Sequence, residues 1–276
     1  MSWPVGVTLG PGAILEVAPP AAAPGLGLGH REVPPDRPGI RVEVGPDPVA
    51  GRSPASEPLV IFDCDGVLVD SESVVTRIEA ELLGRIGVVM TPAEVGEAFI
   101  GLSDDEMHRR IEARWGVAVP PALIAEKADR IERALRLEVT AVDGIAAVLE
   151  QLRAARCIAS SSSPERIRAT VARAGLDHHF GSHVFSATMV ARGKPEPDLF
   201  LFAAAAMHAR PARCVVVEDS PYGVEAGRAA GMTVVGFTGA SHCGPGLPDR
   251  LRTAGAARVA GSAAELTAAL NDVLGA

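Results

Sequence analysis

The stretch 59-LVIFDCDGVLVDSE-72 decides the fold of this chain. Four apolar residues stand directly before Asp63, and Asp65 and Gly66 follow at once. An unbroken apolar run of this length, bounded by turn residues, is typical of a strand that is buried on both faces. Carboxylates at the end of a buried strand are costly unless they are paired or bind a metal. The stretch therefore predicts a buried strand whose acidic end requires a cationic partner.

Similar apolar runs recur along the chain, at residues 156–161, 183–186, 213–218 and 233–237. Helix signals lie between them. Ser163 followed by Pro164 is typical of a helix start, and residues 221–231 form a small-residue segment that ends in glycine. Strands that alternate with helices in this way indicate an α/β, doubly wound fold with a parallel sheet.

The chain divides into three parts of different composition. Residues 1–57 contain half of the 22 prolines and show no sustained hydrophobic period, so we expect a disordered extension or, alternatively, a short binding tail. Residues 58–72 and 141–276 are predicted to form the α/β core. Residues 73–140 show helical spacing only, as at Val74, Ile78 and Leu82, and predict a helical cap inserted after the acidic stretch.

Composition excludes several classes of protein. The net charge of −8 argues against a general nucleic-acid or anionic-membrane binder, and no apolar run is long enough to span a membrane. The four cysteines form no C-x-x-C pair, which indicates reduced and mostly buried thiols. The N-terminus lacks the pattern of a signal peptide. We therefore expect a cytoplasmic protein, either a monomer or a weak homodimer, that binds neither nucleic acid nor membrane.

The predicted strand ends bring chemically complementary groups to one edge of the sheet. Asp63 ends the first strand, Ser161 the second, and Glu218 and Asp219 a later one, while Lys194 lies in a proline-rich loop. Carboxylates from two strands suit Mg2+, which binds few of them and keeps positions open for water and phosphate. A hydroxyl beside a helix N-terminus suits an anion. These groups favour phosphoryl transfer, with an aspartate as the nucleophile and a second carboxyl as the proton carrier.

Four segments of the sequence resemble the motifs of the haloacid dehalogenase superfamily, in their usual order. They are 63-DCDGVLVDSE-72, Ser161, 193-GKPEPD-198 and 218-EDSPYG-223. The resemblance covers the chain from about residue 58 to the C-terminus. It implies a Rossmann-like core with a helical cap, and a magnesium-dependent phosphatase or phosphomutase that acts on a small phosphorylated metabolite.

The resemblance also implies a role for each matching residue. Asp63 would attack phosphorus and form an aspartyl phosphate. Asp65 would protonate the leaving alcohol and then activate the hydrolytic water. Magnesium would be held by the Asp63 carboxylate, the Asp65 carbonyl and the Asp219 carboxylate, with Glu218 as an outer-shell or alternative ligand. The phosphate would be bound by a further set of groups, namely Ser161, the main-chain N–H of Ser162, Lys194, and the main-chain N–H groups of Gly66 and Val67.

Other interpretations of the same residues fit less well. A calcium loop requires an acid or amide at position 67 and a glycine at 68, where this chain has valine and leucine. A D-x-D site of a nucleotide-sugar transferase, or a purely structural role, does not explain Lys194. Asp70 and Glu72 are expected to cap or shape the hinge into the cap. His242 and Cys243 are expected to lie in a surface loop that borders the site, because two ligands are too few for a metal centre.

A β-phosphoglucomutase-like enzyme is the main alternative, because it would share this type of cap. A mutase must also bind the second phosphate of its substrate. Where the mutase pattern has an arginine and a Lys-Asn pair, this chain has Asp104 and then Pro164 and Glu165. Acids at these places would repel a second phosphate. The sequence therefore favours a phosphatase that acts on a sugar phosphate, a sugar-acid phosphate or phosphoglycolate.

Overall fold

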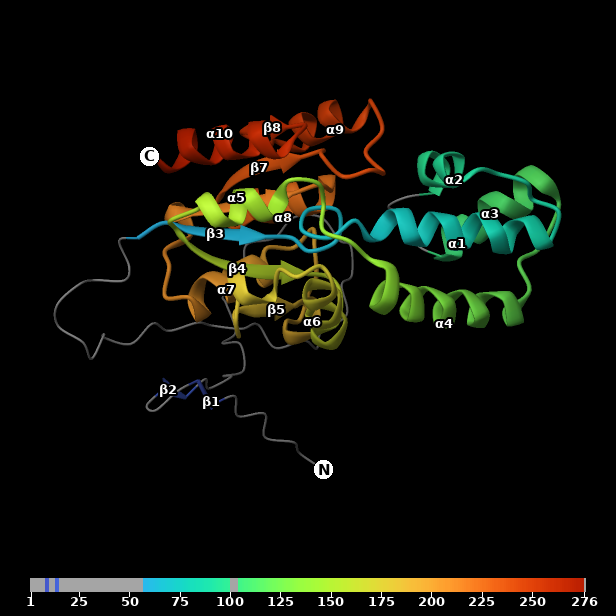
Figure 1. The fold of residues 1–276 in the computed structure, drawn as a ribbon, viewed down its shortest axis with the longest axis horizontal. Helices are drawn as coiled ribbons and strands as arrows, with labels where there is room; N and C mark the ends of the chain where they lie inside the picture. The colour runs from blue at the N-terminus through green and yellow to red at the C-terminus, as the bar shows by residue number, and fades with distance from the viewer. Residues whose placement is uncertain (1–7, 10–12, 15–56, 100–103, 276) are drawn as a thin grey trace, which may run out of the picture. The chain divides into compact units, whose positions relative to one another are not determined.

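The computed structural model describes residues 8–9, 13–14, 57–99 and 104–275 (Figure 1). The chain separates into two units, residues 1–53 and residues 54–276. In the first unit, β1 (Thr8–Leu9) and β2 (Ala13–Ile14) form a short antiparallel pair. The rest of the predicted extension lies outside the described residues. The remaining helices and strands belong to the second unit.

The second unit is built on a six-stranded parallel sheet in the order β5-β4-β3-β6-β7-β8. The predicted α/β doubly wound fold is therefore confirmed. The first strand of this sheet in sequence, β3, lies in the middle of it. The next two strands, β4 and β5, are added on one side of β3, and β6, β7 and β8 on the other, so β3 and β6 flank the topological switch point. The strand bounds are β3 (Leu59–Phe62), β4 (Ala155–Ser160), β5 (Val184–Ser186), β6 (Cys214–Glu218), β7 (Thr233–Phe237) and β8 (Arg258–Ala260).

Helices cover both faces of the sheet, and β3 supplies side chains to both layers. Val60 and Phe62 pack in a cluster with α5, α6 and α10, whereas Leu59 and Ile61 pack in a second cluster with α7, α8 and α9. This alternation follows from the two-residue period of a strand. The helix bounds are α5 (Ile145–Gln151), α6 (Pro164–Arg173), α7 (Asp198–Ala206), α8 (Pro221–Ala229), α9 (Leu247–Ala254) and α10 (Ala263–Leu274).

Four more helices follow the first strand of the sheet and precede α5. They are α1 (Ser71–Arg85), α2 (Pro92–Phe99), α3 (Asp104–Trp115) and α4 (Pro121–Glu138). Helix α1 packs against α2 and α4 (Figure 1). The helical spacing predicted for residues 73–140 is therefore present, and α4 begins at Pro121, directly after Pro120.

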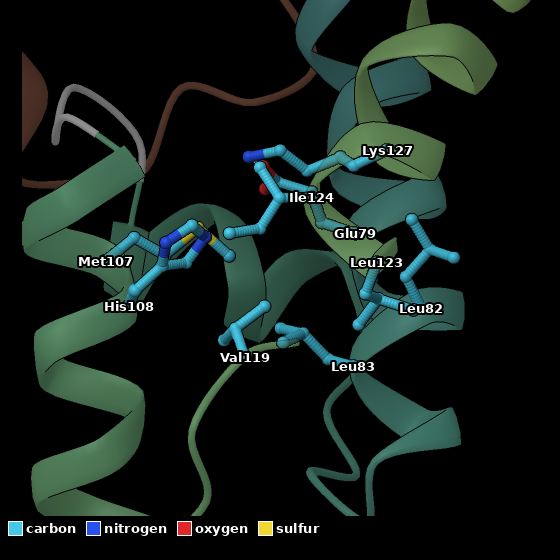
Figure 2. Close-up of a pocket in the computed structure, with 9 residues that line it drawn as sticks. All are labelled: Glu79, Leu82, Leu83, Met107, His108, Val119, Leu123, Ile124 and Lys127. Carbon is cyan, nitrogen blue, oxygen red and sulfur yellow. The ribbon is translucent and has the colours of Figure 1, made fainter. Parts of the chain in front are cut away.

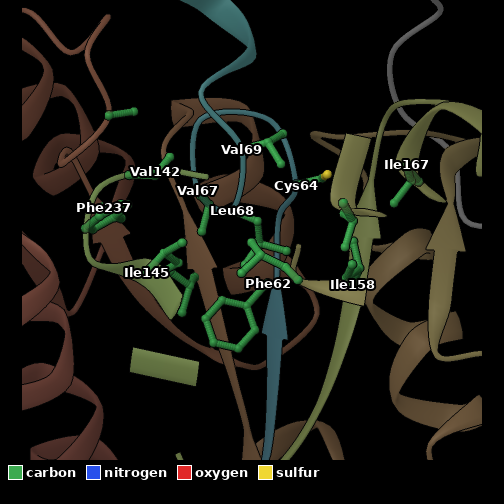
Figure 3. Packing of buried hydrophobic residues seen from close by; sticks show 14 of the residues in the cluster. Phe62, Cys64, Val67, Leu68, Val69, Val142, Ile145, Ile158, Ile167 and Phe237 are labelled. Carbon is green, nitrogen blue, oxygen red and sulfur yellow. The ribbon is translucent and has the colours of Figure 1, made fainter. Parts of the chain in front are cut away.

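The segment between β3 and α1 is buried although it is a loop. Val67, Leu68 and Val69 are inaccessible to solvent and pack with Phe62 and Val142 (Figure 3). The main chain of this segment folds back on itself, because the N–H groups of Leu68 and Val69 both donate to the carbonyl of Cys64. The loop that carries the acidic stretch is therefore fixed by its own apolar residues.

The strand β8 was not predicted, because Arg258–Ala260 is only three residues long and begins with an exposed arginine. Three of the four cysteines are buried and all are free thiols, as expected. No helix among the described residues has the length and apolar character that crossing a bilayer would require.

Candidate active site

The ends of β3 and β6 place three carboxylates together at the switch point. Asp63 follows β3, and its N–H continues the ladder to the carbonyl of Val217 over 2.9 Å. Glu218 ends β6, and Asp219 follows it. One oxygen from each of the three carboxylates lies within 4.8 Å of the other two. Asp63 and Glu218, which are 155 positions apart in sequence, thus belong to one acidic cluster because β3 and β6 are neighbouring strands.

Lys194 is the cation that partners this cluster. Its Nζ donates to Asp63 Oδ1 and to Glu218 Oε1, each over 2.5 Å, and the lysine side chain is only 7% exposed. Burial opposes the charged lysine, but the two carboxylates outweigh burial and raise the pKa of Lys194 above its ordinary value. Lys194 is therefore a permanent positive charge between the strand ends.

Glu218 is fully occupied by neighbouring groups. Its Oε2 accepts hydrogen bonds from the N–H and the hydroxyl of Ser220, over 3.0 and 2.9 Å, while Oε1 binds Lys194. A Cβ on Gly223 would lie 1.9 Å from the Glu218 carboxyl carbon, so only glycine fits there. The carboxylate of Glu218 therefore sits tightly against the start of α8, where it holds the lysine.

Asp65 lies two residues after Asp63 and is held by a different strand end. Ser162 Oγ donates to Asp65 Oδ2 over 2.8 Å, and the Ser186 hydroxyl in turn donates to the carbonyl of Ser162. Asp65 is half-buried, whereas Asp63 is buried. The two carboxyls thus lie in different surroundings, which suits different roles in acid–base chemistry. The contribution of the Ser162 side chain was not anticipated, because the sequence indicated only its main chain.

The other predicted phosphate-binding groups are present at the same edge. Ser161 is exposed directly after β4, and Ser163 caps α6 by accepting from the Arg166 N–H. In this structure the N–H of Ser162 donates to Ser160 Oγ, and the N–H of Gly66 donates to the carbonyl of Val69. The Val67 side chain is buried in the core. The assignment of these main-chain groups to phosphate stays a prediction.

His242 lies in a loop that borders the site, as the sequence suggested, but its side chain is buried and not at the surface. Its side chain is only 6% exposed, and Nε2 lies 3.2 Å from Asp219 Oδ2. Burial lowers the pKa of this histidine, but its contacts with Asp219 and Cys243 outweigh burial and raise the pKa to about 10. A Cβ on Gly66, whose φ is +80°, would lie 1.9 Å from Asp219 Oδ2 and 2.9 Å from His242 Cε1. Gly66 therefore makes room for this pair. The Gly/Pro-rich sequence around position 242 gave no sign of the contact.

Asp70 and Glu72, which were expected to cap or shape the hinge into the cap, lie at the start of α1. Asp70 occupies the N-cap position of α1 without a side-chain cap, and its Oδ1 accepts from Ser241 Oγ over 2.9 Å. Burial raises the pKa of Glu72 to about 7, the charge of His242 lowers it, and the charges of Asp65 and Asp219 add to the increase. Glu72 is therefore an acid close to the site that titrates near neutral pH.

The donor set fits a hard divalent cation. Burial raises the pKa of Asp63 and of Asp219, and neighbouring carboxylates add to both increases. Such repulsion between buried carboxylates is what a bound cation relieves. Oxygen ligands are what Mg2+ prefers. Because Glu218 is occupied by Lys194 and Ser220, the geometry favours Asp63 and Asp219 as direct ligands, and Glu218 as the residue that positions the lysine.

Comparisons with known proteins agree with this geometry. A 6-phosphogluconate phosphatase of Escherichia coli is 31% identical over 196 residues, which are 70% of this chain and 88% of that protein. A β-phosphoglucomutase of Bacillus subtilis is 30% identical over 187 residues, covering 64% of this chain and 81% of that protein.

A solved structure and a family model also match this chain. The solved structure is that of a haloacid dehalogenase family hydrolase from Deinococcus radiodurans with bound phosphate and sodium. It matches with a TM-score of 0.71 and 36% identity, and the match covers 79% of this chain and 96% of that one. The model that matches residues 58–231 describes a haloacid dehalogenase-like hydrolase.

Proposed function

Because this chain belongs to the haloacid dehalogenase-like hydrolases, we propose that it is a magnesium-dependent phosphatase. It hydrolyses a small phosphate monoester through an aspartyl phosphate on Asp63. One observation supports this most strongly: Asp63 is buried against Lys194, while Asp65, two residues on, is half-buried and held by Ser162. A nucleophile that is paired with a permanent cation and a nearby acid that can reach solvent are the two groups that this reaction requires.

The reaction follows from the roles of these residues. A carboxylate oxygen of Asp63 attacks phosphorus, and the bond from phosphorus to the ester oxygen breaks. Asp65 gives its proton to the leaving oxygen, so that the alcohol departs neutral. Asp65, now a carboxylate, takes a proton from water as the water attacks phosphorus, and the bond between phosphorus and Asp63 breaks. Inorganic phosphate leaves and both aspartates return to their starting states.

The remaining groups neutralise charge and orient the phosphate. Lys194 lies beside Asp63, so it can stabilise the negative charge that develops on the phosphoryl oxygens. Ser161, at the end of β4 and before α6, is placed to donate to the phosphate, together with main-chain N–H groups of residues 66, 67 and 162. Magnesium, when bound at Asp63, Asp219 and the Asp65 carbonyl, would neutralise the phosphate and align it with the nucleophile.

Phosphatase activity is favoured over mutase activity by the loops that would meet a second phosphate. Pro164 and Glu165 open α6 directly after the serine run. Glu165 carries a negative charge where the mutase pattern has a Lys-Asn pair, so a second phosphate would be repelled there. The third departure, Asp104, begins α3, but the side chain of Asp104 lies outside the described residues.

The test is magnesium-dependent release of phosphate from a panel of esters by the purified protein. We expect hydrolysis with magnesium, none with EDTA, and loss of activity in Asp63→Asn. If no monoester releases phosphate, the proposed function is wrong. Incubation with β-glucose 1-phosphate and a trace of the bisphosphate separates the alternative, because a mutase would form glucose 6-phosphate without free phosphate.

We further propose that residues 73–140 form the cap over this site, and that the protein is a cytoplasmic monomer or weak homodimer. The helical segment α1 to α4, inserted directly after the acidic stretch, supports the first statement. Sedimentation at several concentrations tests the second. A chain that starts near residue 56 and retains its activity would support our interpretation of residues 1–57 as dispensable.

A further inference from the structure

The carboxylate of Asp65 has one hydrogen-bond partner in the described part of the chain, the hydroxyl of Ser162. Ser162 Oγ donates to Asp65 Oδ2 over 2.8 Å, which engages one carboxylate oxygen and leaves Oδ1 available. Asp63, in contrast, is paired with the ammonium of Lys194. The nucleophile of the proposed reaction thus has a charged partner, and the proton carrier has a neutral one.

A neutral hydroxyl suits a carboxyl group that gives and takes a proton. A hydroxyl can donate a hydrogen bond to a carboxylate and can equally accept one from a carboxylic acid. An ammonium can only donate, so it is a partner for the carboxylate alone. The contact between Ser162 and Asp65 can therefore persist through both steps of the reaction.

Ser162 is itself held from two further sides by buried serines. Its N–H donates to Ser160 Oγ over 3.1 Å, and its carbonyl accepts from Ser186 Oγ over 2.7 Å. Ser160 and Ser186 are partners in the register of β4 with β5, and they are 1% and 0% exposed. A hydroxyl is costly to bury unless it is hydrogen-bonded. Here two buried hydroxyls fix the main chain of one residue.

The start of α6 does not require the Ser162 hydroxyl. The next residue, Ser163, is the N-cap of this helix, and its Oγ accepts from the N–H of Arg166 over 3.3 Å. Helix capping is therefore complete without the side chain of residue 162. The Ser162 hydroxyl instead reaches the loop after β3, 97 positions earlier in the sequence.

Glu79 of α1 shows the opposite arrangement. Figure 2 shows its carboxylate next to the ammonium of Lys127, in a recess that is lined mainly by apolar side chains. Lys127 Nζ lies 3.2 Å from Glu79 Oε1. Because an ammonium donates and cannot accept, this pair holds a carboxylate and not a carboxylic acid. The comparison favours Asp65, with its hydroxyl partner, as the group that exchanges a proton.

We propose that Ser162 is a positioning residue, whose hydroxyl orients the carboxyl group of Asp65 so that Oδ1 exchanges the proton. This inference rests on the proposed function. In the first step the proton passes from Oδ1 to the ester oxygen, which keeps the electron pair of its broken bond to phosphorus. In the second step Oδ1 takes a proton from the attacking water. The Ser162 hydroxyl stays on Oδ2 throughout, and Ser160 and Ser186 hold Ser162 in place.

The experiment compares leaving groups that need a proton with one that does not. The alkoxides of hexitol 6-phosphate and 6-phosphogluconate need a proton to leave, whereas p-nitrophenolate leaves as a stable anion. We would measure kcat/KM for these three esters, because it covers the steps up to release of the alcohol and not the later attack of water. The proteins are the wild type, Ser162→Ala, Ser162→Thr and the matched control Ser163→Ala, which removes the neighbouring hydroxyl.

We expect Ser162→Ala to lower kcat/KM for the two alkyl esters about tenfold to a hundredfold, because a misplaced acid loses much of its contribution. For p-nitrophenyl phosphate the change should stay below about threefold, since its leaving group needs no acid. Ser162→Thr keeps the hydroxyl and should restore most of the activity on alkyl esters. An equal fall for all three esters in Ser162→Ala would overturn the inference.

The control separates positioning from stability. Ser163→Ala removes the cap of α6, so we expect a lower melting temperature, but the ratio of kcat/KM for the alkyl esters to that for p-nitrophenyl phosphate should stay as in the wild type. If this ratio falls equally in Ser163→Ala and Ser162→Ala, disturbance of the start of α6 explains the result and the inference is wrong.

Crystal structures of the wild type and of Ser162→Ala, both with EDTA, test the positioning without turnover. We expect the Asp65 carboxyl group to rotate or lose its defined position in the variant, while Asp63 and Lys194 stay in place. An unmoved Asp65 would overturn the inference even if the protein is a phosphatase. A displaced Asp65 in a protein that hydrolyses no ester would support the positioning by Ser162 and count against the proposed function alone.

Discussion

Replacing Glu72 by glutamine should change how the stability of the protein depends on pH. Burial raises the pKa of Glu72 from its ordinary value of 4.5 to about 7. Between these two pH values the folded protein keeps the proton that the unfolded chain has lost. The free energy of unfolding therefore falls as pH rises through this window, and stays level above it. Glutamine cannot lose a proton, so the variant lacks this fall.

The size of the effect follows from the width of the window. The difference between about 7 and 4.5 is about 2.5, and each pH unit corresponds to about 1.4 kcal/mol, so the total is ~3 kcal/mol. Relative to wild type, Glu72→Gln should be about 3 kcal/mol more stable at pH 8 than it is near pH 4.5. This is a large part of the stability of a typical domain.

The assay is urea unfolding of wild type and variant at four pH values between 5 and 8, with EDTA present throughout to exclude bound metal. Glu81→Gln on the same helix is the control, because the hydrogen bond from Arg130 lowers the pKa of Glu81, so that this carboxyl is ionised in both states above pH 5 and its replacement should leave the pH dependence unchanged. Parallel stability curves for wild type and Glu72→Gln would refute the reasoning, since they would mean that Glu72 titrates alike in both states.

Three further outcomes follow from the site. Lys194→Met leaves Asp63 and Glu218 buried without their cation. We therefore expect the free energy of unfolding, measured with denaturant, to fall by about 3–5 kcal/mol near neutral pH and by less at low pH. A loss that does not depend on pH would contradict this. Gly223→Ala places a Cβ against the Glu218 carboxyl group, and we expect a destabilisation of about 1–3 kcal/mol with a drop in activity, whereas Gly84→Ala, in open space, should be neutral or stabilising by melting temperature. His242→Ala should weaken magnesium binding about tenfold or more in calorimetric titration, because Asp219 loses its partner, and His242→Gln should restore part of the affinity. Unchanged magnesium affinity in both variants would show that His242 does not position Asp219.

Much of the fold was predictable because the informative strands are buried on both faces. Such strands read as continuous apolar runs, and β3, β4, β6 and β7 were found in this way. Their ends then indicated Asp63 and Asp219 as neighbours, since parallel strands share an edge, and Lys194 was expected to join them from its loop. The strand β8 was not predicted, because its three residues include an exposed arginine and so form no continuous apolar run.

The contacts that sequence reasoning missed depend on loops and on helix packing. His242 reaches Asp219 through a loop after β7, and no local pattern reports where such a side chain points. The link between Ser162 and Asp65 spans 97 positions, and the pair of Glu79 with Lys127 spans 48. The sequence showed the helical spacing of the apolar residues in α1. It did not show that polar residues on another face of the same helix are also buried.

The hydrogen bonds that hold the acidic loop also constrain the order in which the chain can fold. Asp65, Asp63 and Asp70 are bound by partners 97, 131 and 171 positions later in the sequence. Contacts at such separations form late, because the entropy of closing long loops must be overcome first. During synthesis the acidic stretch emerges long before Lys194 and Ser241 are available. A chain that ends before Lys194 and β6 therefore cannot assemble the nucleophile with its cation, so binding of a ligand at Asp63 would report that these two parts are in place.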